Sequence, residues 1–453
     1  MNLQGIPTML HRRLWATRAA TGLLLLSSLS FLSGCGSKDD GTSSGSGSSG
    51  NTGTLRVINA TTQRSAVGLR IDDVSRETAI ERDATSATYR VTAGSHTIAL
   101  TNSSGSALAS TTPTIAAGSA TTLVAWTGDN NLVKYLSLDE LETVPASGRS
   151  KLLVFNAARD AGALDVHLTP ATEALSDSPL LGNLAAGSGS SGYSSVNAGS
   201  HRLRLLKAGS VLASDVRLDT TVTLPDAGVA ALVITPSTGG VLAHALLLQP
   251  AKAVTALTNT QARVRILSAL PTNLPVAGTI NGATLPLLGS SPGFGSYALV
   301  PAGSSTPQVT VNGGTLTGAS WSAAPGSDTT LFVWGTAAAP QFATLSDDNR
   351  LPSSTSAARI RLLHGLGNLA QDLTLNIAGA PVTTASRGSM SPVTSVSAVT
   401  NTTLTVTSSG TAATVYELKD KTLDANGVYS VFLLGDSSLP SGNGLTTAVV
   451  KER

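Results

Sequence analysis

The sequence contains little cysteine, few aromatic side chains and few charges. Cys35 is the only cysteine among 453 residues, aromatic residues make up 4% of the chain and charged residues 12%. The usual charged share of a globular protein is roughly twice as large, about 25%. One cysteine excludes a disulfide framework within the chain. The lack of a concentrated basic segment argues against nucleic acid as a partner. The abundance of small residues, 45 glycines among them, favours an extracytoplasmic β-rich protein.

Residues 1–34 have the composition of a secretory signal peptide. Arg12, Arg13 and Arg18 precede an apolar stretch over residues 19–32, with "GLLLLSSLSFL" at its centre. This is the order of the basic and hydrophobic regions of a signal, and the stretch is too short and too rich in serine for a stable membrane span. Removal of the segment takes three of the 29 basic residues and leaves 26 against 27 acidic ones, so the mature chain is nearly neutral.

The run Leu-Ser-Gly-Cys at residues 32–35 resembles the signal of bacterial lipoproteins. The resemblance implies cleavage before Cys35, a diacylglycerol on its sulfur and an acylated amino group, with palmitate among the chains. One acyl chain holds a protein only marginally, so three on one residue give a stable membrane anchor. Gly36 stands where an aspartate would favour the inner membrane, so we expect the outer membrane, with the protein facing the periplasm or the surface. The alternative is an unmodified Cys35 at the end of an ordinary signal.

A tether and four repeats follow the signal. The 18 residues after Cys35, up to Gly53, are rich in Gly and Ser and span roughly 20 to 25 Å as a flexible chain. Four similar motifs, "LRVINAT", "LLVFNAA", "VRILSAL" and "IRLLHGL", begin at residues 55, 152, 264 and 360, and Tyr89, Tyr193 and Tyr297 recur at steps of 104 residues. We therefore predict a signal, a lipidated tether and four repeats, over residues 1–34, 35–53, 54–145, 150–250, 261–352 and 357–453.

The apolar pattern within the repeats has the period of β-strands. Leu203 and Leu205 alternate with Arg202 and Arg204, and turn-forming residues separate such runs. The sequence therefore predicts an all-β chain of tandem immunoglobulin-like antiparallel β-sandwich domains, with no amphipathic helix after the signal. The Pro-, Thr- and Ser-rich connectors predict that neighbouring sandwiches touch little; they cover residues 143–150, 249–262 and 348–358.

The order of these landmarks resembles a bacterial family of extracytoplasmic β domains, domain-of-unknown-function family 4397, over most of residues 54–450. That family often has a histidine after the opening strand. His364 matches it, whereas Asn59, Asn156 and Ser268 stand at that place in the other repeats. The resemblance implies the fold and no reaction.

The remaining histidines fit structural roles best. His96 and His201 begin equivalent strands, and we expect each to bond a turn carbonyl at the rim of its sandwich rather than act as a ligand or general base. Ser305 takes that place in the third repeat, where it fits a similar hydrogen bond. Asp165 and His167 lie two residues apart on one strand, but a metal site needs a third protein ligand at least.

No other motif predicts a cofactor. The oxygen-rich segments 129–131 and 347–349 are placed to hold calcium at domain junctions, but they lack the spacing of a dedicated loop and are expected to be turns. Two glycine triads, beginning at residues 45 and 187, match G-x-G-x-x-G without the strand and helix that a dinucleotide site requires. We therefore predict no catalytic residue, no metal and no cofactor, and Cys35 as the site of lipid attachment.

These features predict a lipid-anchored cell-envelope protein that acts as a non-enzymatic binding or spacer module, with an envelope protein or a glycan as its partner. One alternative is a glycan-binding surface protein, which requires Trp126 and Trp334 to be exposed; we expect both to pack in a core or rim instead. The other is an envelope hydrolase, which requires two close, buried carboxylates in one repeat.

Overall fold

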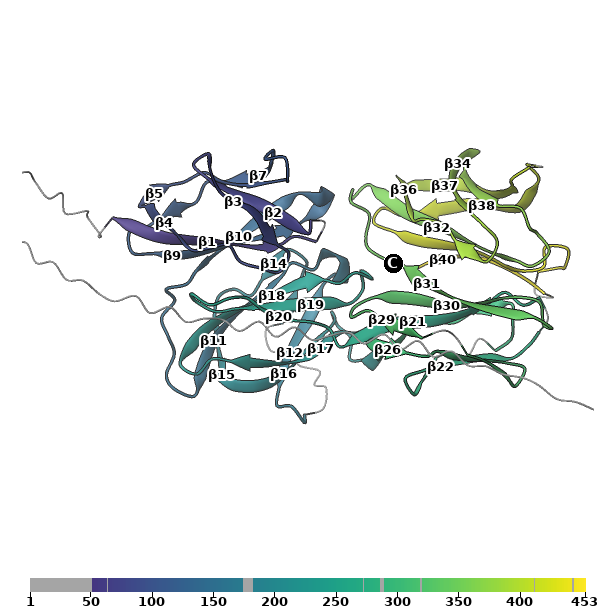
Figure 1. Cartoon of the computed structure of the whole chain (residues 1–453), viewed down its shortest axis with the longest axis horizontal. Coiled ribbons are helices and arrows are strands. Elements are labelled where there is room, and N and C mark those ends of the chain that lie inside the picture. Colours follow the sequence, from purple (N-terminus) through teal and green to yellow (C-terminus); the bar gives the residue numbers. More distant parts are fainter. Residues whose placement is uncertain are drawn as a thin grey trace, which may run out of the picture. The chain divides into compact units, whose positions relative to one another are not determined.

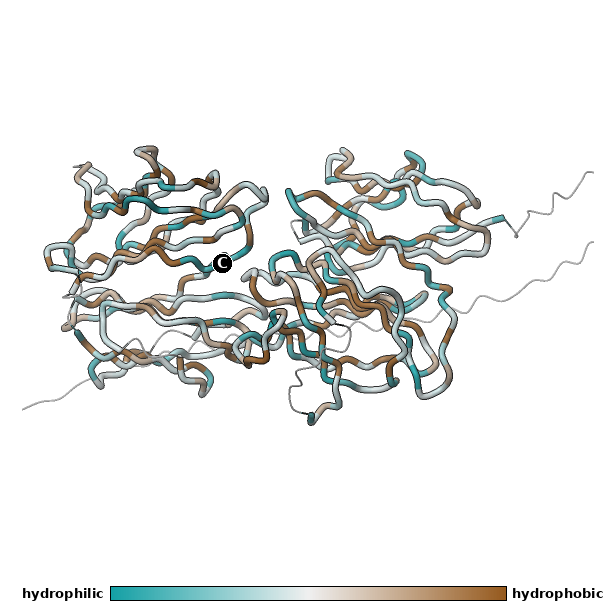
Figure 2. The backbone as a smooth tube through the Cα atoms, turned by 180° about the vertical axis from the view of Figure 1, so that it is seen from behind, coloured by the Kyte–Doolittle hydropathy of each residue, from teal (hydrophilic) through white to brown (hydrophobic). Residues whose placement is uncertain are grey.

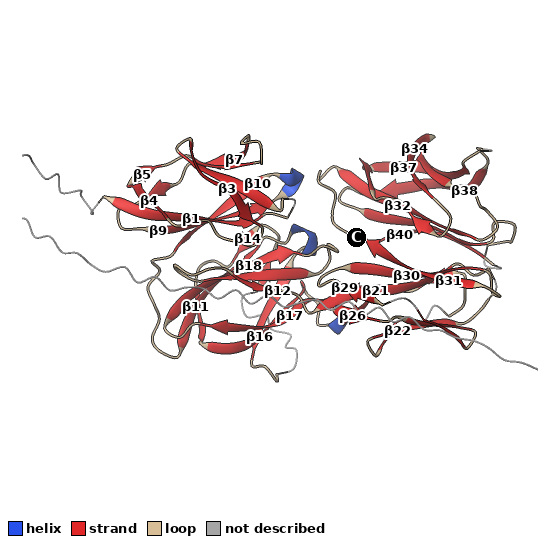
Figure 3. Cartoon of the chain, viewed as in Figure 1, coloured by secondary structure: helices blue, strands red, loops and turns tan. Residues whose placement is uncertain are grey.

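The computed structural model describes most of the chain after the predicted tether. The described residues are 51–62, 64–173, 182–271, 273–285, 289–317, 320–410, 412–441 and 444–453. Cys35, the predicted signal and nearly all of the tether lie outside them. Strands dominate the described part, and its helices are three short 3-10 turns (Figures 1 and 3): η1 (Asp129–Asn131), η2 (Arg159–Ala161) and η3 (Ala213–Asp215). The predicted all-β fold is confirmed.

The described strands form four sets of sheets, which we call sandwiches 1 to 4, and none of these sheets mixes strands of two sets. Sandwich 1 contains β1 (Thr52–Ala60), β2 (Ala66–Ile71), β3 (Val74–Glu81), β4 (Tyr89–Thr92), β5 (Gly94–Ser95), β6 (Ile98–Thr101), β7 (Ala107–Thr111), β8 (Thr114–Ile115), β9 (Ala120–Thr127) and β10 (Val133–Asp139). Its sheets have the orders β10-β9-β1-β4 and β3-β2-β6-β7, and β5 pairs with β8.

Sandwich 2 contains β11 (Arg149–Asn156), β12 (Leu164–Thr169), β13 (Asn183–Leu184), β14 (Ser188–Gly189), β15 (Ser194–Asn197), β16 (Gly199–Lys207), β17 (Val216–Leu224), β18 (Gly228–Pro236), β19 (Ala243–Leu248) and β20 (Thr255–Leu257). One sheet has the order β14-β11-β18-β19-β20, with β15 also on β11, and the other is β13-β12-β16-β17. Strand β20 lies in the segment predicted as a connector.

Sandwich 3 contains β21 (Gln261–Ser268), β22 (Val276–Ile280), β23 (Ala283–Leu285), β24 (Gly293–Phe294), β25 (Ala298–Pro301), β26 (Gly303–Ser305), β27 (Gln308–Val311), β28 (Gly314–Thr317), β29 (Trp321–Ala323), β30 (Asp328–Gly335) and β31 (Pro340–Asp347). Its sheets are β24-β21-β30-β31, with β25 also on β21, and β23-β22-β27-β28, and β26 pairs with β29.

Sandwich 4 contains β32 (Ala357–Leu366), β33 (Leu373–Ile377), β34 (Ala380–Ala385), β35 (Ser389–Met390), β36 (Thr394–Ser397), β37 (Val399–Ser408), β38 (Thr414–Leu423), β39 (Val428–Gly435) and β40 (Leu445–Lys451). Its sheets are β35-β32-β39-β40, with β36 also on β32, and β34-β33-β37-β38.

Among the described strands, each sandwich contains one parallel pair in otherwise antiparallel sheets. The strand of the opening motif runs parallel to the closing apolar strand in the pairs β1 with β9, β11 with β18, β21 with β30 and β32 with β39. Parallel neighbours are typically buried on both faces. The pairing therefore places two continuous apolar runs side by side in the middle of one sheet.

The opening strands are buried on both of their faces. Leu55 and Val57 of β1 point into the core of sandwich 1, whereas Ile58 and Ala60 join a second cluster on the other side of the sheet. Hydrophobic stretches run along the strands in Figure 2. A sheet that is apolar on its outer face needs a second layer to cover it.

Neighbouring sandwiches supply that second layer to each other. Residues of both sandwiches 1 and 2 form one cluster: Ile58, Ala60, Val124, Trp126, Leu138, Phe155, Ala157, Ala231, Val233, Leu246 and Leu248. Sandwiches 3 and 4 share another: Leu267, Ala269, Phe332, Leu363, Phe432 and Leu434. Residues 49–453 form one compact unit. The prediction that neighbouring sandwiches touch little is therefore wrong, because exposing these outer faces to water would be costly.

Candidate functional site

A cleft of about 870 Å³ lies where sandwiches 2, 3 and 4 meet. Sandwich 2 contributes residues 161–163 and the segment that leads through η3 to Arg217. Sandwich 3 contributes β21 and residues 294–297, and sandwich 4 contributes residues 450–453. Ligand sites in proteins commonly have volumes of about 300 to 1,000 Å³ and often lie between domains. This cleft is therefore the leading candidate site in the described part of the chain.

The side chains that line the cleft carry an excess of positive charge. The basic ones are Lys207, Arg217, Arg263, Arg265, Lys451 and Arg453, and the acidic ones are Asp215 and Glu452. Low-dielectric walls concentrate the field of such a group of charges, so the cleft favours an anion.

The alternation of strand β21 positions two of these arginines. Val264 and Ile266 point into the core of sandwich 3. Since successive side chains of a strand point to opposite faces, Arg263 and Arg265 face away from that core. They flank the ring of Tyr297, with the guanidinium carbons 4.3 Å and 4.5 Å from the ring centroid. Stacking of this kind stabilises a cation and holds its plane in place.

Tyr297 also anchors this group through its hydroxyl. The hydroxyl donates a hydrogen bond of 2.6 Å to Asp347 Oδ2, and it accepts one of 3.1 Å from Asn349 Nδ2. Burial, together with the charge of Asp347, raises the pKa of Tyr297 well above its usual 10, so the hydroxyl stays protonated. Tyr297 therefore forms a rigid, neutral wall of the cleft.

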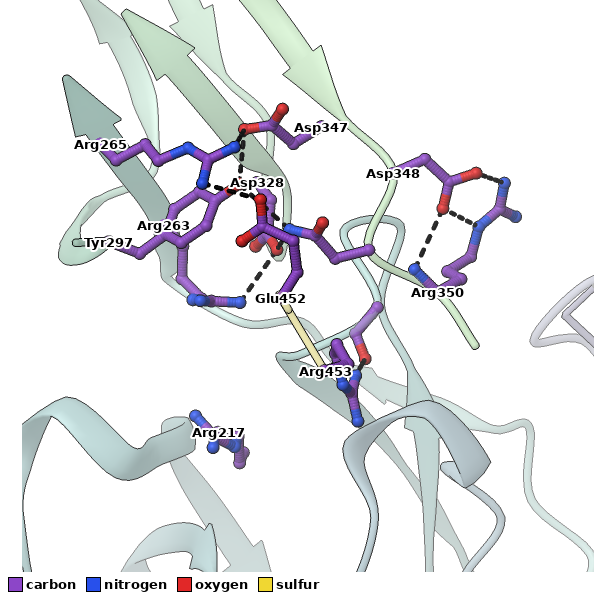
Figure 4. Close-up of polar contacts among 12 residues, drawn as sticks. Arg217, Arg263, Arg265, Tyr297, Asp328, Asp347, Asp348, Arg350, Glu452 and Arg453 are labelled. Atoms are coloured by element: carbon purple, nitrogen blue, oxygen red, sulfur yellow. Dashed lines mark hydrogen bonds and ion pairs between the residues drawn. The ribbon is translucent and has the colours of Figure 1, made fainter. Parts of the chain in front are cut away.

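Buried ion pairs join sandwich 3 to sandwich 4 beside the cleft (Figure 4). Arg265 donates to Glu452 Oε1 at 2.8 Å and to Thr330 Oγ1 at 2.8 Å, and its side chain is almost fully buried. A second pair also joins the two sandwiches: Arg361 Nη2 of sandwich 4 lies 3.4 Å from Asp347 Oδ1 of sandwich 3. Removal of one partner of a buried ion pair strongly destabilises a folded protein, because the other charge is left buried without compensation. These contacts therefore fix the two sandwiches relative to each other.

Arg56, Arg265 and Arg361 occupy the same position of the opening motif and each reaches a neighbouring sandwich. Arg56 donates to the backbone oxygens of Gln249, at 2.8 Å, and of Lys252. These acceptors lie in a segment that was predicted to be a free connector. The arginine of the opening motif is therefore a contact between sandwiches.

The close, buried carboxylates that a hydrolase would require are present in sandwich 3. Asp328 and Asp347 face each other on β30 and β31, and the side chains of both are 0% exposed. Burial raises the pKa of Asp328 to about 6. However, Arg263 and Asn349 both donate to Asp328 Oδ2, at 2.9 Å and 2.7 Å, and neither carboxylate is among the described residues that line the cleft. The pair is therefore closed to a substrate in this conformation.

Besides Arg265, whose Nη2 forms no hydrogen bond in the described structure, two arginines at the cleft have incomplete partners. Arg453 donates to the carbonyl oxygen of Gly240 at 2.7 Å, and among the described residues it forms no ion pair. Arg217 reaches Asp215 at 3.4 Å with one nitrogen, and its buried Nε has no hydrogen-bond partner in the described structure. Figure 4 shows Arg217 on a ribbon separate from those of Arg263 and Arg453.

The two guanidinium groups also repel one another. Burial lowers the pKa of Arg453 to about 10; the charge of Asp160 opposes this shift, and the charges of Arg217 and Arg263 add to it. Burial and the charge of Arg263 likewise lower the pKa of Arg217. Both groups remain protonated at neutral pH, since arginine titrates far above it. An anion between them would relieve the repulsion.

The histidines at the rims are structural. His96 Nε2 donates to the Thr92 oxygen at 2.7 Å, and His201 Nε2 donates to the Asn197 oxygen at 2.9 Å, which confirms the predicted bonds to turn carbonyls. A hydrogen bond to Asp72 raises the pKa of His96. Ser305 differs, because its buried hydroxyl has no hydrogen-bond partner in the described structure; the prediction for Ser305 is wrong.

His364, the histidine that matches the pattern of the family, stabilises the turn after the opening strand of sandwich 4. Its Nδ1 accepts a hydrogen bond of 3.3 Å from the Leu366 N–H, and its Nε2 donates to the Gln371 oxygen at 3.0 Å. In the other sandwiches Asn59, Asn156 and Ser268 accept from the N–H two residues ahead in the same way. This position of the opening motif therefore needs a buried hydrogen-bond acceptor, and histidine, asparagine and serine can each provide it.

The oxygen-rich positions considered for metal already have protein partners. Asp165 accepts from the Gly209 N–H at 2.7 Å and is buried, as is His167. Arg159 lies 2.5 Å from Asp129. In the segment 347–349, arginines contact both acidic side chains, Asp347 and Asp348. Among the described residues no three His, Cys, Asp or Glu side chains are grouped as a metal site would require.

The two tryptophans pack between sandwiches. Trp126 is buried and meets Phe155 edge to face, with ring centroids 5.4 Å apart, which confirms the packing prediction for this residue. Trp334 is half-buried and packs against the cluster of sandwiches 3 and 4. The glycines Gly187 and Gly388 lie against the two rings, both at positive φ, and a Cβ at Gly388 would come within 2.7 Å of Trp334. The exposed tryptophan pair required by the glycan hypothesis does not exist.

Comparison with known proteins confirms the resemblance to the family for part of the chain. Residues 53–167 match the family model described as domain of unknown function (DUF4397), and this range covers nearly all of sandwich 1 together with β11 and most of β12 of sandwich 2. A search of curated proteins finds no match. No helix among the described residues is long and apolar enough to cross a membrane.

Several solved bacterial structures are weakly similar. A protein proposed to act in cell adhesion from Bacteroides uniformis is 12% identical with a TM-score of 0.21, over 45% of this chain and 99% of its own. Its counterpart from Bacteroides ovatus is 11% identical with a TM-score of 0.19, over 45% and 98%. The TIE protein of Bacillus anthracis is 10% identical with a TM-score of 0.15, over 84% and 67%. These likenesses are too weak to indicate what this chain binds.

Proposed function

We propose that the chain is a lipid-anchored protein of the bacterial cell envelope, and that its sandwiches form a non-enzymatic binding module. Acyl chains on Cys35 hold it to the outer membrane, and the Gly/Ser-rich tether separates the module from the lipid. The four repeats extend over residues 54–145, 150–250, 261–352 and 357–453. The ligand binds in the cleft between sandwiches 2, 3 and 4.

The cleft is the observation that carries this proposal. It is assembled by three sandwiches, and it presents Arg217 and Arg453, two cations that lack a full set of partners. Buried polar groups without partners are costly, so their position on a cleft favours binding of a ligand that supplies the partners. The closed carboxylate pair, Asp328 and Asp347, favours a binding module over a hydrolase.

Membrane fractionation of cells tests the anchor. Cys35→Ala should abolish palmitate labelling and release the protein from the membrane, because no acyl chain is attached. Gly36→Asp is the matched control: it should keep the label and move the protein to the inner-membrane fraction. If Cys35→Ala stays with the membrane in the same amount as the wild type, the anchoring proposal is wrong.

A further inference from the structure

We infer that the cleft binds an acidic saccharide, with the carboxylate of the sugar held between Arg217 and Arg453 and the sugar ring against Phe294. This inference rests on the proposed binding function and names the class of ligand. It follows from three features of the cleft: the unused donors of the two arginines, their mutual repulsion, and an exposed aromatic ring on the adjacent wall.

The unused donors define the anionic part of the ligand. Arg453 uses one N–H on the Gly240 carbonyl, and Arg217 has a buried Nε without a partner in the described structure. A guanidinium presents its donors in a planar fork that matches the two oxygens of a carboxylate. A carboxylate placed between the two groups would therefore satisfy both and cancel part of their repulsion.

The neighbouring arginines do not compete for this role. Arg265 is paired with Glu452 at 2.8 Å and Arg263 with Asp328 at 2.9 Å, both shorter contacts than the 3.4 Å between Arg217 and Asp215. Arg265 Nη2 forms no hydrogen bond in the described structure, but it lies 3.7 Å from the Asp347 carboxylate. Their guanidinium groups are also fixed by stacking on Tyr297. They therefore serve as a rigid cationic wall, which leaves Arg217 and Arg453 to make the direct contacts.

Phe294 supplies the surface for the ring. It lines the cleft, the residue is 37% exposed, and its ring packs against the buried Phe432, with ring centroids 5.3 Å apart. An exposed aromatic ring held from behind offers a flat apolar surface at little cost in conformational entropy. Val241 and Val450 add apolar contact in the same cleft. A sugar ring with one carboxylate matches this combination better than a small inorganic anion does.

Calorimetric titration of the full chain in detergent tests the ligand class. The probes are trigalacturonate, which carries a carboxylate on each ring, neutral galactotriose, and inorganic phosphate. We expect trigalacturonate to bind, with affinity that falls as salt is added, and galactotriose to bind at least tenfold more weakly, since charge-assisted hydrogen bonds are lost. Equal binding of the two trisaccharides, or binding of phosphate without trigalacturonate, would overturn the inference.

Substitutions locate the site. Arg217→Gln and Arg453→Gln should each weaken trigalacturonate binding about tenfold or more, and Arg453→Lys should weaken it less because the charge is kept. Arg90→Gln, the same change at an exposed position of sandwich 1, is the matched control. A thermal melt of each variant checks that it is folded.

These outcomes are distinguishable from failure of the proposed function. If trigalacturonate binds and both glutamine variants keep affinities within twofold of the wild type, the cleft assignment is wrong while the binding function stands. If no acidic saccharide binds, the ligand class is wrong. Neither result affects the fractionation of Cys35→Ala, which reports on the anchor alone.

Discussion

Replacement of Trp126 by alanine tests whether sandwiches 1 and 2 are docked as the structure shows. The indole is buried against Phe155 and other residues of sandwich 2, not in the core of its own sandwich. Removal of a buried tryptophan side chain costs about 3 to 5 kcal/mol. For a folding unit of roughly 200 residues this corresponds to a fall in melting temperature of about 10 °C. We therefore expect Trp126→Ala to lower the calorimetric transition of sandwiches 1 and 2 by that amount.

The control is the same substitution in another sandwich. Trp321 packs against the core of sandwich 3, so Trp321→Ala should affect sandwiches 3 and 4 and leave the transition of sandwiches 1 and 2 in place. Both variants lose one indole, so the comparison separates docking from a general effect of tryptophan loss. A calorimetric trace of Trp126→Ala that matches the wild type within about 1 °C would refute the docked arrangement.

Three further predictions concern buried groups. His364→Ala should lower the free energy of unfolding by about 1 to 3 kcal/mol and His364→Asn by less, measured by urea denaturation, because asparagine restores the acceptor. The pKa of Asp328 is raised to about 6 in the folded chain, so the native state binds its proton more tightly than the unfolded state does. Stability should therefore fall by up to about 3 kcal/mol as the pH rises from about 4 to 6, and Asp328→Asn should remove this dependence in urea titrations at several pH values. Gly388→Val should lower the melting temperature of sandwiches 3 and 4, since its Cβ would collide with Trp334 and its φ is positive; an unchanged melt would contradict that packing.

The sequence was sufficient to predict the strands and the repeats, because period-two alternation and the recurring opening motifs are local signals. It was also sufficient for the hydrogen bonds of the rim histidines to backbone carbonyls, which reach only four residues back. The docking of sandwiches was missed although a signal existed. Phe155 and Leu153 are apolar at the positions where a strand with one solvated face carries polar residues. The run "LLVF" therefore indicated burial on both faces.

The candidate site was missed for a different reason. Arg217, Arg263 and Arg453 are far apart in the chain and belong to three sandwiches, so no local pattern connects them. The alternation of β21 indicates that Arg263 faces away from the core of its sandwich, but not what it faces. Only the arrangement of the sandwiches, which depends on their outer apolar faces, brings the three side chains together.

The parallel pairing of opening and closing strands was not expected from an antiparallel sandwich. It has a consequence for the cleft, because it places β21 beside β30 and so brings Arg263 next to Asp328. Asp328 neutralises Arg263, and the neighbouring Arg453 is left without such a partner among the described residues.

A crystal structure of the chain with trigalacturonate is the most direct test of the account. We expect a sugar carboxylate within about 3 Å of nitrogens of both Arg217 and Arg453, and a sugar ring against Phe294. Density for the saccharide on another surface, or a side-chain carboxylate of the chain itself within about 3 Å of the Arg453 guanidinium, would contradict the account.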